Sequence, residues 1–168
     1  MLTYLLQAKA ELHNIAQVKP VDTEEYSHDY KFKFQCNGCK KVHPKPIIIN
    51  LENEFEVTGF RRKANLLIKC KECKRERYAI LTQLNNGGIL GNGQYNDVIK
   101  ITTHGMRLLD FIPDDQFECE TNNGKIIQEI GLLDGEWMGE TDNGEIIQVS
   151  NVDWNIKMIK ERDFARSV

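Results

Sequence analysis

Hydrophobic and polar side chains alternate along several segments of the chain, which is the pattern of half-buried β-strands. The clearest case covers residues 30–36, where apolar residues at even positions alternate with polar residues at odd positions and the segment ends at Cys36. Residues 2–12 alternate in the same way except at Leu5. Their composition also favours a helix, but the period of two leads us to interpret them as a strand.

Shorter apolar segments continue the pattern along the rest of the chain. They cover residues 47–51, 55–57, 66–70, 78–82, 98–101, 108–113 and 152–158. Two of them, residues 66–70 and 78–82, flank a polar turn and predict a hairpin. Residues 160–168 predict a polar tail. We therefore expect a mainly β fold.

A stretch rich in glycine and asparagine interrupts the pattern near the middle of the chain. Residues 85–93 contain four glycines and three asparagines, a composition typical of flexible connectors. A phosphate-binding loop would instead end in Lys-Ser or Lys-Thr and lead into a helix. We expect an N-terminal β half at residues 1–86, a connector at residues 87–94 and an acidic C-terminal β half at residues 95–168.

Two nine-residue segments in the second half are nearly the same. Residues 120–128 and 140–148 are identical at seven of nine positions, and both contain Asn-Gly shortly before Ile-Ile. This pattern predicts two similar hairpin corners. Chance or sequence bias explains the similarity nearly as well, because two copies are too few for a repeat protein.

Length and composition indicate a folded protein inside the cell. The chain has 168 residues, of which 40% are hydrophobic, enough to bury a core. Its first residues lack the basic region of a signal peptide, and no apolar run approaches the length of a membrane span. We expect a soluble protein without membrane contact, in the cytoplasm or also the nucleus, where cysteines stay reduced.

Charge is distributed unevenly although the net value is only −3. Residues 1–100 hold 16 Lys and Arg against 11 Asp and Glu, whereas residues 101–168 hold 6 against 14. The bias is strongest at residues 61–77, with eight cations and two acids. Such a patch is typical of nucleic-acid binding, and equally of cations that offset the negative charge of nearby thiolates. We favour the second interpretation because no aromatic side chains for base stacking accompany the cations.

Two Cys-x-x-Cys steps are the most specific chemical signal. They place Cys36 with Cys39 and Cys70 with Cys73, which is the ligand pattern of a four-cysteine zinc site. Gly38 is expected to supply a left-handed conformation in the first turn. The spacer at residues 40–69 is longer than in a simple zinc ribbon, so some sheet must form within it. Four thiolates also suit iron.

Other reactive residues do not form a site that the sequence can identify. The four histidines are scattered, and His43 draws attention only because it lies four residues after Cys39. With four cysteines around the metal, no position is left for a reacting water, so catalysis is not expected. Cys119 lies between Glu118 and Glu120, which should raise its pKa and keep it inert.

The chain resembles the eukaryotic CXXC-motif-containing zinc-binding proteins, a family without an established biochemical activity. The likeness rests on residues 12–15, Pro20-Val21, both Cys-x-x-Cys steps with residues 69–76, residues 59–61, Gly105, residues 110–113 and Glu136-Trp137. Residues 138–142 depart from the acidic run of those proteins. The resemblance implies two similar β halves, the first binding zinc through Cys36, Cys39, Cys70 and Cys73.

Two functions from different classes follow from these observations. The first is a non-enzymatic protein-interaction module with one structural zinc ion, which uses sheet edges and the oppositely charged halves to recognise protein partners. The second is metal handling or thiol redox chemistry, in which the thiols give up zinc to a partner or to oxidants. A methionine sulfoxide reductase is a distant third, since no matching motif surrounds Cys119.

Overall fold

The computed structural model describes residues 1–160, which form strands and loops with no helix, so the predicted mainly β fold is confirmed. It follows that no described segment is a helix able to cross a membrane. All of the predicted polar tail except Lys160 lies outside the described residues. The strands are β1 (Leu2–His13), β2 (Ile15–Pro20), β3 (Tyr30–Cys36), β4 (Ile47–Ile49), β5 (Leu66–Lys69), β6 (Glu76–Gln83), β7 (Asn96–His104), β8 (Met106–Ile112), β9 (Phe117–Thr121), β10 (Ile126–Ile130), β11 (Trp137–Glu140) and β12 (Ile146–Ile159).

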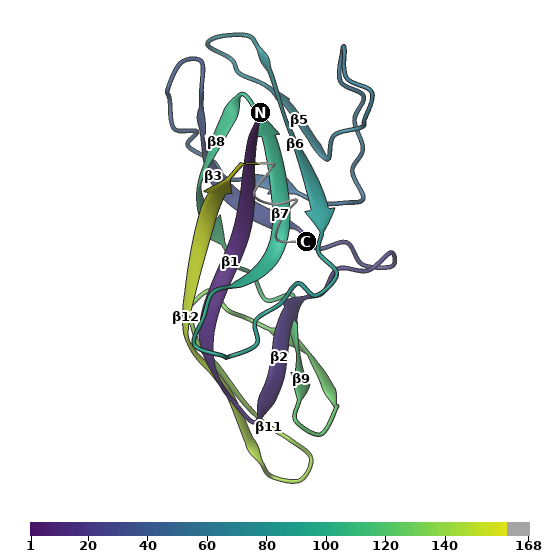
Figure 1. The fold of residues 1–168 in the computed structure, drawn as a ribbon, viewed down its shortest axis with the longest axis vertical. Coiled ribbons are helices and arrows are strands. Elements are labelled where there is room, and N and C mark those ends of the chain that lie inside the picture. The colour runs from purple at the N-terminus through teal and green to yellow at the C-terminus, as the bar shows by residue number, and fades with distance from the viewer. Residues whose placement is uncertain (161–168) are drawn as a thin grey trace.

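The strands form three antiparallel sheets. A six-stranded sheet has the order β11-β12-β1-β7-β6-β5, and two three-stranded sheets have the orders β10-β9-β2 and β4-β3-β8. Strands β1, β7 and β12 run along the long axis of the molecule (Figure 1). Strand β1 pairs with β12 from Thr3 opposite Ile159 to His13 opposite Gln148, so the first and last described strands lie side by side.

Two single residues in the left-handed region let long strands pass from one sheet into another. Asn14, with φ of 57°, separates β1 from β2, and Gly105, with φ of 75°, separates β7 from β8. Asparagine and glycine tolerate this conformation better than other residues. After β1 and after β7 the chain thereby leaves the six-stranded sheet and continues as β2 and β8. These two strands belong to the two smaller sheets, at opposite ends of the molecule (Figure 1).

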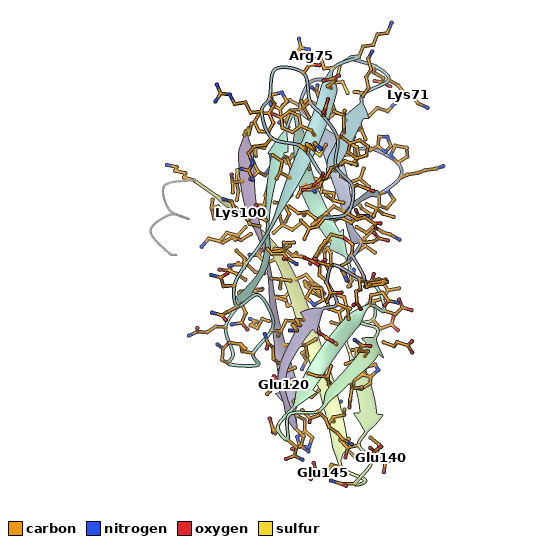
Figure 2. All side chains as sticks on the ribbon, turned by 90° about the vertical axis from the view of Figure 1, so that its right-hand side faces the viewer. Lys71, Arg75, Lys100, Glu120, Glu140 and Glu145 are labelled. Atoms are coloured by element: carbon orange, nitrogen blue, oxygen red, sulfur yellow. The ribbon has the colours of Figure 1, made fainter. Side chains whose placement is uncertain are left out.

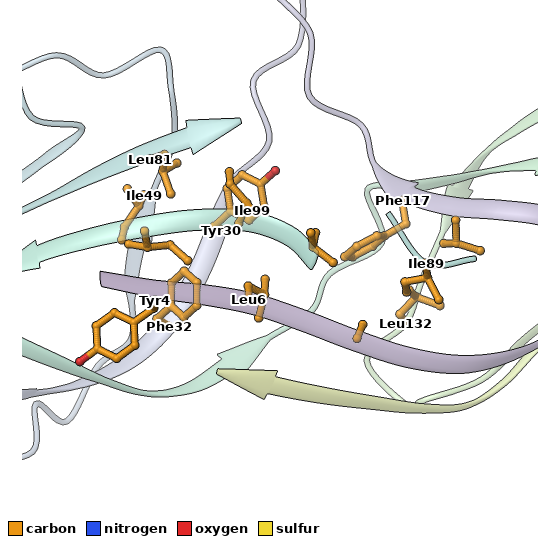
Figure 3. Packing of buried hydrophobic residues seen from close by; sticks show 14 of the residues in the cluster. Tyr4, Leu6, Tyr30, Phe32, Ile49, Leu81, Ile89, Ile99, Phe117 and Leu132 are labelled. Carbon is orange, nitrogen blue, oxygen red and sulfur yellow. The ribbon is translucent and has the colours of Figure 1, made fainter. Parts of the chain in front are cut away.

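One continuous hydrophobic core joins the sheets. Alternate residues of β1, including Tyr4 and Leu6, pack with Phe32, Ile99 and residues of the other sheets (Figure 3). Burying each such side chain contributes about 1.5–3 kcal/mol. Leu5, which interrupts the alternation, is also buried because β1 is a central strand.

The Gly- and Asn-rich connector lies between two strands of the same sheet. Strands β6 and β7 pair directly, and β1 lies between β7 and β12, so the sheet mixes strands from residues 1–86 and 95–168. Ile89 is only 1% exposed and exchanges two backbone hydrogen bonds with Val18. The middle of the connector is thus anchored to β2, and the division into two similar halves stays a prediction.

The two nearly identical segments form the two matching hairpin turns that the sequence predicts. In the first, the Thr121 N–H donates to the Lys125 carbonyl at 2.8 Å and the Gly124 N–H to the Thr121 carbonyl at 2.9 Å. Thr141, Gly144 and Glu145 repeat both bonds at 2.8 and 2.9 Å. An ion pair between Lys125 and Asp142 links the two turns. We call these two turns, together with the adjoining parts of β9, β10, β11 and β12, the acidic end.

Candidate metal centre

The two Cys-x-x-Cys steps lie on two turns that follow strand ends, as the sequence predicts. Strand β3 ends at Cys36, and the Cys36 N–H donates to the Lys41 carbonyl at 3.0 Å. Cys70 directly follows β5, and its N–H donates to the Arg75 carbonyl at 3.2 Å in the β5-β6 hairpin. We call this part of the molecule the thiol end.

The left-handed residue of each turn is a lysine, so the expectation for Gly38 is wrong. Lys40 and Lys74 have φ of 59° and 57°, and Gly38 has no positive φ. Each lysine N–H donates to the carbonyl of the first cysteine in its step, at 2.9 and 2.8 Å. Gly38 is required for space instead, because a Cβ there would lie 2.7 Å from Nη2 of Arg77.

The structure brings all four predicted thiols together. Their Sγ atoms lie within 4.8 Å of one another, with 3.6 Å between Cys36 and Cys73 and 3.7 Å between Cys39 and Cys70. A tetrahedron of Zn–S bonds of about 2.3 Å has sulfur atoms about 3.8 Å apart. The donor set and its spacing therefore fit one zinc ion.

Arg77 of β6 is the main residue of this centre that sequence reasoning did not single out. It is only 4% exposed, and its Nε and Nη2 each lie 3.4 Å from Sγ of Cys36, while Nη2 lies 3.2 Å from Sγ of Cys73. Gly38 and Gly105 make room for it, since a Cβ on Gly105 would lie 2.3 Å from its Cδ. Arg77 thus places a buried positive charge against two thiols.

Hydrogen bonds favour the ionised forms of two of the thiols, Cys36 and Cys70. Burial raises the pKa of Cys36, but hydrogen bonds from the Cys39 backbone and the Arg77 guanidinium outweigh it and lower the pKa to about 6. Backbone hydrogen bonds from Cys73 and Glu72 lower the pKa of Cys70. The Lys41 backbone hydrogen bond lowers the pKa of Cys39, but burial and hydrogen bonds with Cys36 and Cys70 outweigh it and raise this pKa. Thiolates are the form that binds zinc, so Cys36 and Cys70 are the two thiols best prepared for a cation.

Arg77 could not be distinguished in the sequence from the other cations at residues 61–77. The distinguishing feature is the hairpin register, in which Ile68 of β5 lies opposite Arg77 of β6. Neither composition nor charge contains this register. The general expectation that cations compensate the thiolates could be made from the sequence, but the residue that does so from a buried position could not.

The other reactive residues of the sequence lie outside the thiol cluster. The His43 ring stacks on Phe34 at 4.8 Å between centroids, and its Nδ1 lies 3.0 Å from the Lys45 carbonyl. Cys119 is 1% exposed in β9, and burial raises its pKa. Neither belongs to the group of described residues that could hold a metal ion.

An open cleft of about 570 Å³ lies directly beside the thiols. Cys36, Cys39 and Cys70 contribute to its wall, whereas Cys73 does not. Cys39 and Cys70 are partly exposed, in contrast to the buried Cys36. Two of the thiols are thus accessible to molecules that enter the cleft.

Comparison with known proteins identifies similar chains in several eukaryotic organisms. Residues 5–157 match the family model described as "CXXC motif containing zinc binding protein, eukaryotic". The human protein named "CXXC motif containing zinc binding protein" is 27% identical, over 86% of this chain and 89% of its own. The Schizosaccharomyces pombe protein named "UPF0587 protein C2D10.03c" is 25% identical, over 91% of this chain and 96% of its own.

Two solved structures share the fold. The structure titled "Crystal Structure of C1orf123" has a TM-score of 0.85 at 23% identity and covers 94% of this chain and 99% of its own. A hypothetical protein from Plasmodium falciparum has a TM-score of 0.82 at 20% identity, covering 94% of this chain and all of its own. The whole described architecture therefore occurs in experimentally solved chains.

Proposed function

Since this chain belongs to the eukaryotic family of CXXC motif containing zinc binding proteins, we propose that its clustered thiols hold one structural zinc ion in a non-enzymatic protein-interaction module. The ligands are Cys36, Cys39, Cys70 and Cys73. The zinc joins the turn after β3 to the β5-β6 hairpin and fixes the surface around them. The protein acts in the cytoplasm and binds protein partners through that surface.

The observation that carries this proposal is the pairing of a complete four-thiol cluster with the buried guanidinium of Arg77. Four thiolates fill a tetrahedral zinc site and leave no place for the water or substrate that catalytic zinc requires. Four thiolates and Zn²⁺ carry a net charge of about −2. Arg77 donates to Cys36 and Cys73 and offsets part of that charge, as groups next to metal ligands commonly do.

The charge distribution supports protein partners. Lys71 and Arg75 lie at the thiol end of the elongated molecule, and Glu140 and Glu145 lie at the acidic end (Figure 2). Separate surfaces of opposite charge select and orient partners of complementary charge.

The first experiment is the metal content of protein purified without added metal, measured by mass spectrometry, with a competition against chelators of increasing strength. We expect one zinc per chain that is released only by the strongest chelators, together with loss of folded structure at the thiol end. Zinc that leaves while the hydrogen-exchange protection of β5 and β6 is unchanged would contradict the structural role.

The second candidate function, metal handling or thiol redox chemistry, is favoured by the partial exposure of Cys39 and Cys70 in the open cleft. A recipient protein or an oxidant can reach these sulfur atoms without unfolding the chain. Readily extracted or substoichiometric zinc in the same measurement would support this function in place of the first.

A further inference from the structure

We propose that the cleft beside the thiols is a binding site for a short acidic peptide segment of a partner protein, with one large apolar side chain inserted. This inference rests on the proposed function, because the zinc would fix the turns that form one wall. The cleft holds about 570 Å³, within the size range of typical ligand pockets and large enough for a few side chains.

The apolar part of the cleft suits a large hydrophobic side chain. Phe34, Pro44, Ile47 and Ile68 line it. His43, which also lines it, has its ring stacked on Phe34 with only 21° between the planes. An aromatic or aliphatic side chain placed here would lose its contact with water, which is the main source of affinity in such sites.

The charged part of the cleft suits carboxylates. Of the five cations in its wall, Lys41 is paired with Glu72 and Arg77 faces the thiols. Lys45, Lys69 and Lys71 are exposed, and no described carboxylate forms an ion pair with them. Three unneutralised lysines next to an apolar wall complement a peptide that combines Asp or Glu with an apolar residue.

A peptide fits these observations better than nucleic acid or a second copy. Nucleic-acid strands need a charged track with aromatic platforms, and this cleft has one exposed ring, His43, that is already stacked. The acidic end of another copy carries the exposed Met138 of β11, but two joined hairpins are wider than a cleft that holds a few side chains. Both alternatives become outcomes of the test.

The test is a fluorescence-anisotropy titration of the zinc-loaded protein with a short labelled peptide of Asp and Glu residues around one Phe. Replacing that Phe by Ser should weaken binding about tenfold or more, because the apolar contact is lost. The variant K45Q/K69Q/K71Q should bind about tenfold more weakly. The matched variant K33Q/K125Q/K157Q, which removes the same charge outside the cleft, should bind as the wild type does.

Several results would overturn the inference. The peptide could fail to bind, the two triple variants could lose equal peptide affinity, or the Phe and Ser peptides could bind with equal affinity. A single-stranded oligonucleotide that displaces the peptide would indicate a nucleic-acid site. Self-association that is abolished by the Lys-to-Gln changes in the cleft would indicate a second copy as the occupant. Zinc content and thermal midpoint are measured on every sample. Peptide failure with one tightly held zinc sinks this inference alone, whereas loosely held zinc sinks the structural role of the metal.

Discussion

The thiol end and the acidic end are each built from two adjacent turns, but different interactions hold the turns together. At the acidic end, the Thr121 and Thr141 turns close through their own hydrogen bonds, and the Lys125–Asp142 ion pair links them. At the thiol end, the Lys41–Glu72 ion pair plays a similar part. Only there do four thiols and a buried arginine also connect the turns.

This difference leads us to expect that only the thiol end depends on a metal for its stability. Each acidic turn is closed by backbone hydrogen bonds within its own hairpin, and Asn14 adds one hydrogen bond to each of the two hairpins. The thiol turns bring four sulfur atoms and a guanidinium into one small space, which is stable only if the charges are compensated. We therefore expect the two ends to respond differently to the same chemical treatments.

The largest effect should come from removing one thiol. C70S should abolish zinc binding and thereby unfold the thiol end. Apparent zinc-binding free energies of about 10–16 kcal/mol in zinc-finger peptides match or exceed the stability of a typical domain, so loss of the metal should remove most of the local stability. Hydrogen exchange should show lost protection in β5 and β6 and retained protection in β9 and β10. C119A is the control and should keep its zinc. A C70S protein with unchanged zinc and thermal midpoint would refute the four-ligand assignment.

The next largest effect should come from Arg77. R77M keeps much of the apolar stem of the side chain but removes the positive charge that lies beside Cys36 and Cys73. This change should lower the unfolding free energy by about 3–5 kcal/mol. Zinc affinity should fall about 10–100-fold in competition with a chromogenic chelator. R75M, two residues earlier and exposed, should change neither quantity. Equal effects of the two variants would show that Arg77 contributes only general charge.

Glycine positions separate backbone strain from crowding at the thiol end. Gly105 and Gly124 both have positive φ, at 75° and 84°, but only at Gly105 would a Cβ meet Arg77, whereas nothing lies within 4 Å at Gly124. G124A should cost about 1 kcal/mol in denaturant unfolding. G105A should cost about 1–3 kcal/mol more and also lower zinc affinity. Equal costs with unchanged zinc affinity would rule out the crowding of Arg77.

His28, in the loop between β2 and β3, should make the unfolding free energy depend on pH. It is fully buried, neither ring nitrogen has a hydrogen bond, and its Nε2 lies 3.7 Å from a carboxylate oxygen of Asp114. Burial lowers its pKa below the usual 6.5, although the charge of Asp114 opposes this. Below pH 6.5 the unfolded chain binds a proton that the native protein does not. The unfolding free energy should therefore decrease as the pH is lowered from 6.5 towards the lowered pKa of native His28. The decrease should be at most about 1.4 kcal/mol per pH unit.

The control for this effect compares variants across the same pH range. H28L should reduce the slope of unfolding free energy against pH between 6.5 and the lowered pKa, whereas H13Q, at an exposed position, should retain it. Because both variants keep the thiols, any zinc release on acidification contributes equally to both curves. Identical slopes for H28L and wild type would show that His28 is not the titrating group.

The smallest effects should come from the two exposed ion pairs. K41Q at the thiol end and K125Q at the acidic end should each change the unfolding free energy by only about 0–1 kcal/mol, because exposed pairs are screened by water and salt. Denaturant midpoints measured at low and high salt check this expectation. A large loss in K41Q alone would mean that this pair, rather than the thiols, holds the two turns together.

The local features of the fold could be predicted because each is determined by neighbouring residues. The alternation at residues 30–36 predicts β3, and the Asn-Gly pairs predict the turns of the acidic end. The Cys-x-x-Cys spacing likewise predicts which four thiols come together, since each pair lies within one turn.

The long-range features could not be predicted from the same patterns. Alternation identifies β1 and β12 as strands but does not say that they pair across the whole chain. The connector looked flexible because of its glycines, yet Ile89 is buried against Val18. Arg77 resembles its neighbouring cations until the β5-β6 register is known. Each of these depends on contacts between residues distant in sequence.

The pairing of β1 with β12 has a consequence for synthesis on the ribosome. One edge of β1 has no partner until residues 146–159 have emerged, so the central sheet can close only after nearly the whole chain has been made. The four thiols are complete once residue 73 has emerged. A growing chain can therefore capture its metal early, while the apolar edge of its first strand is still open to chaperones or to misassociation.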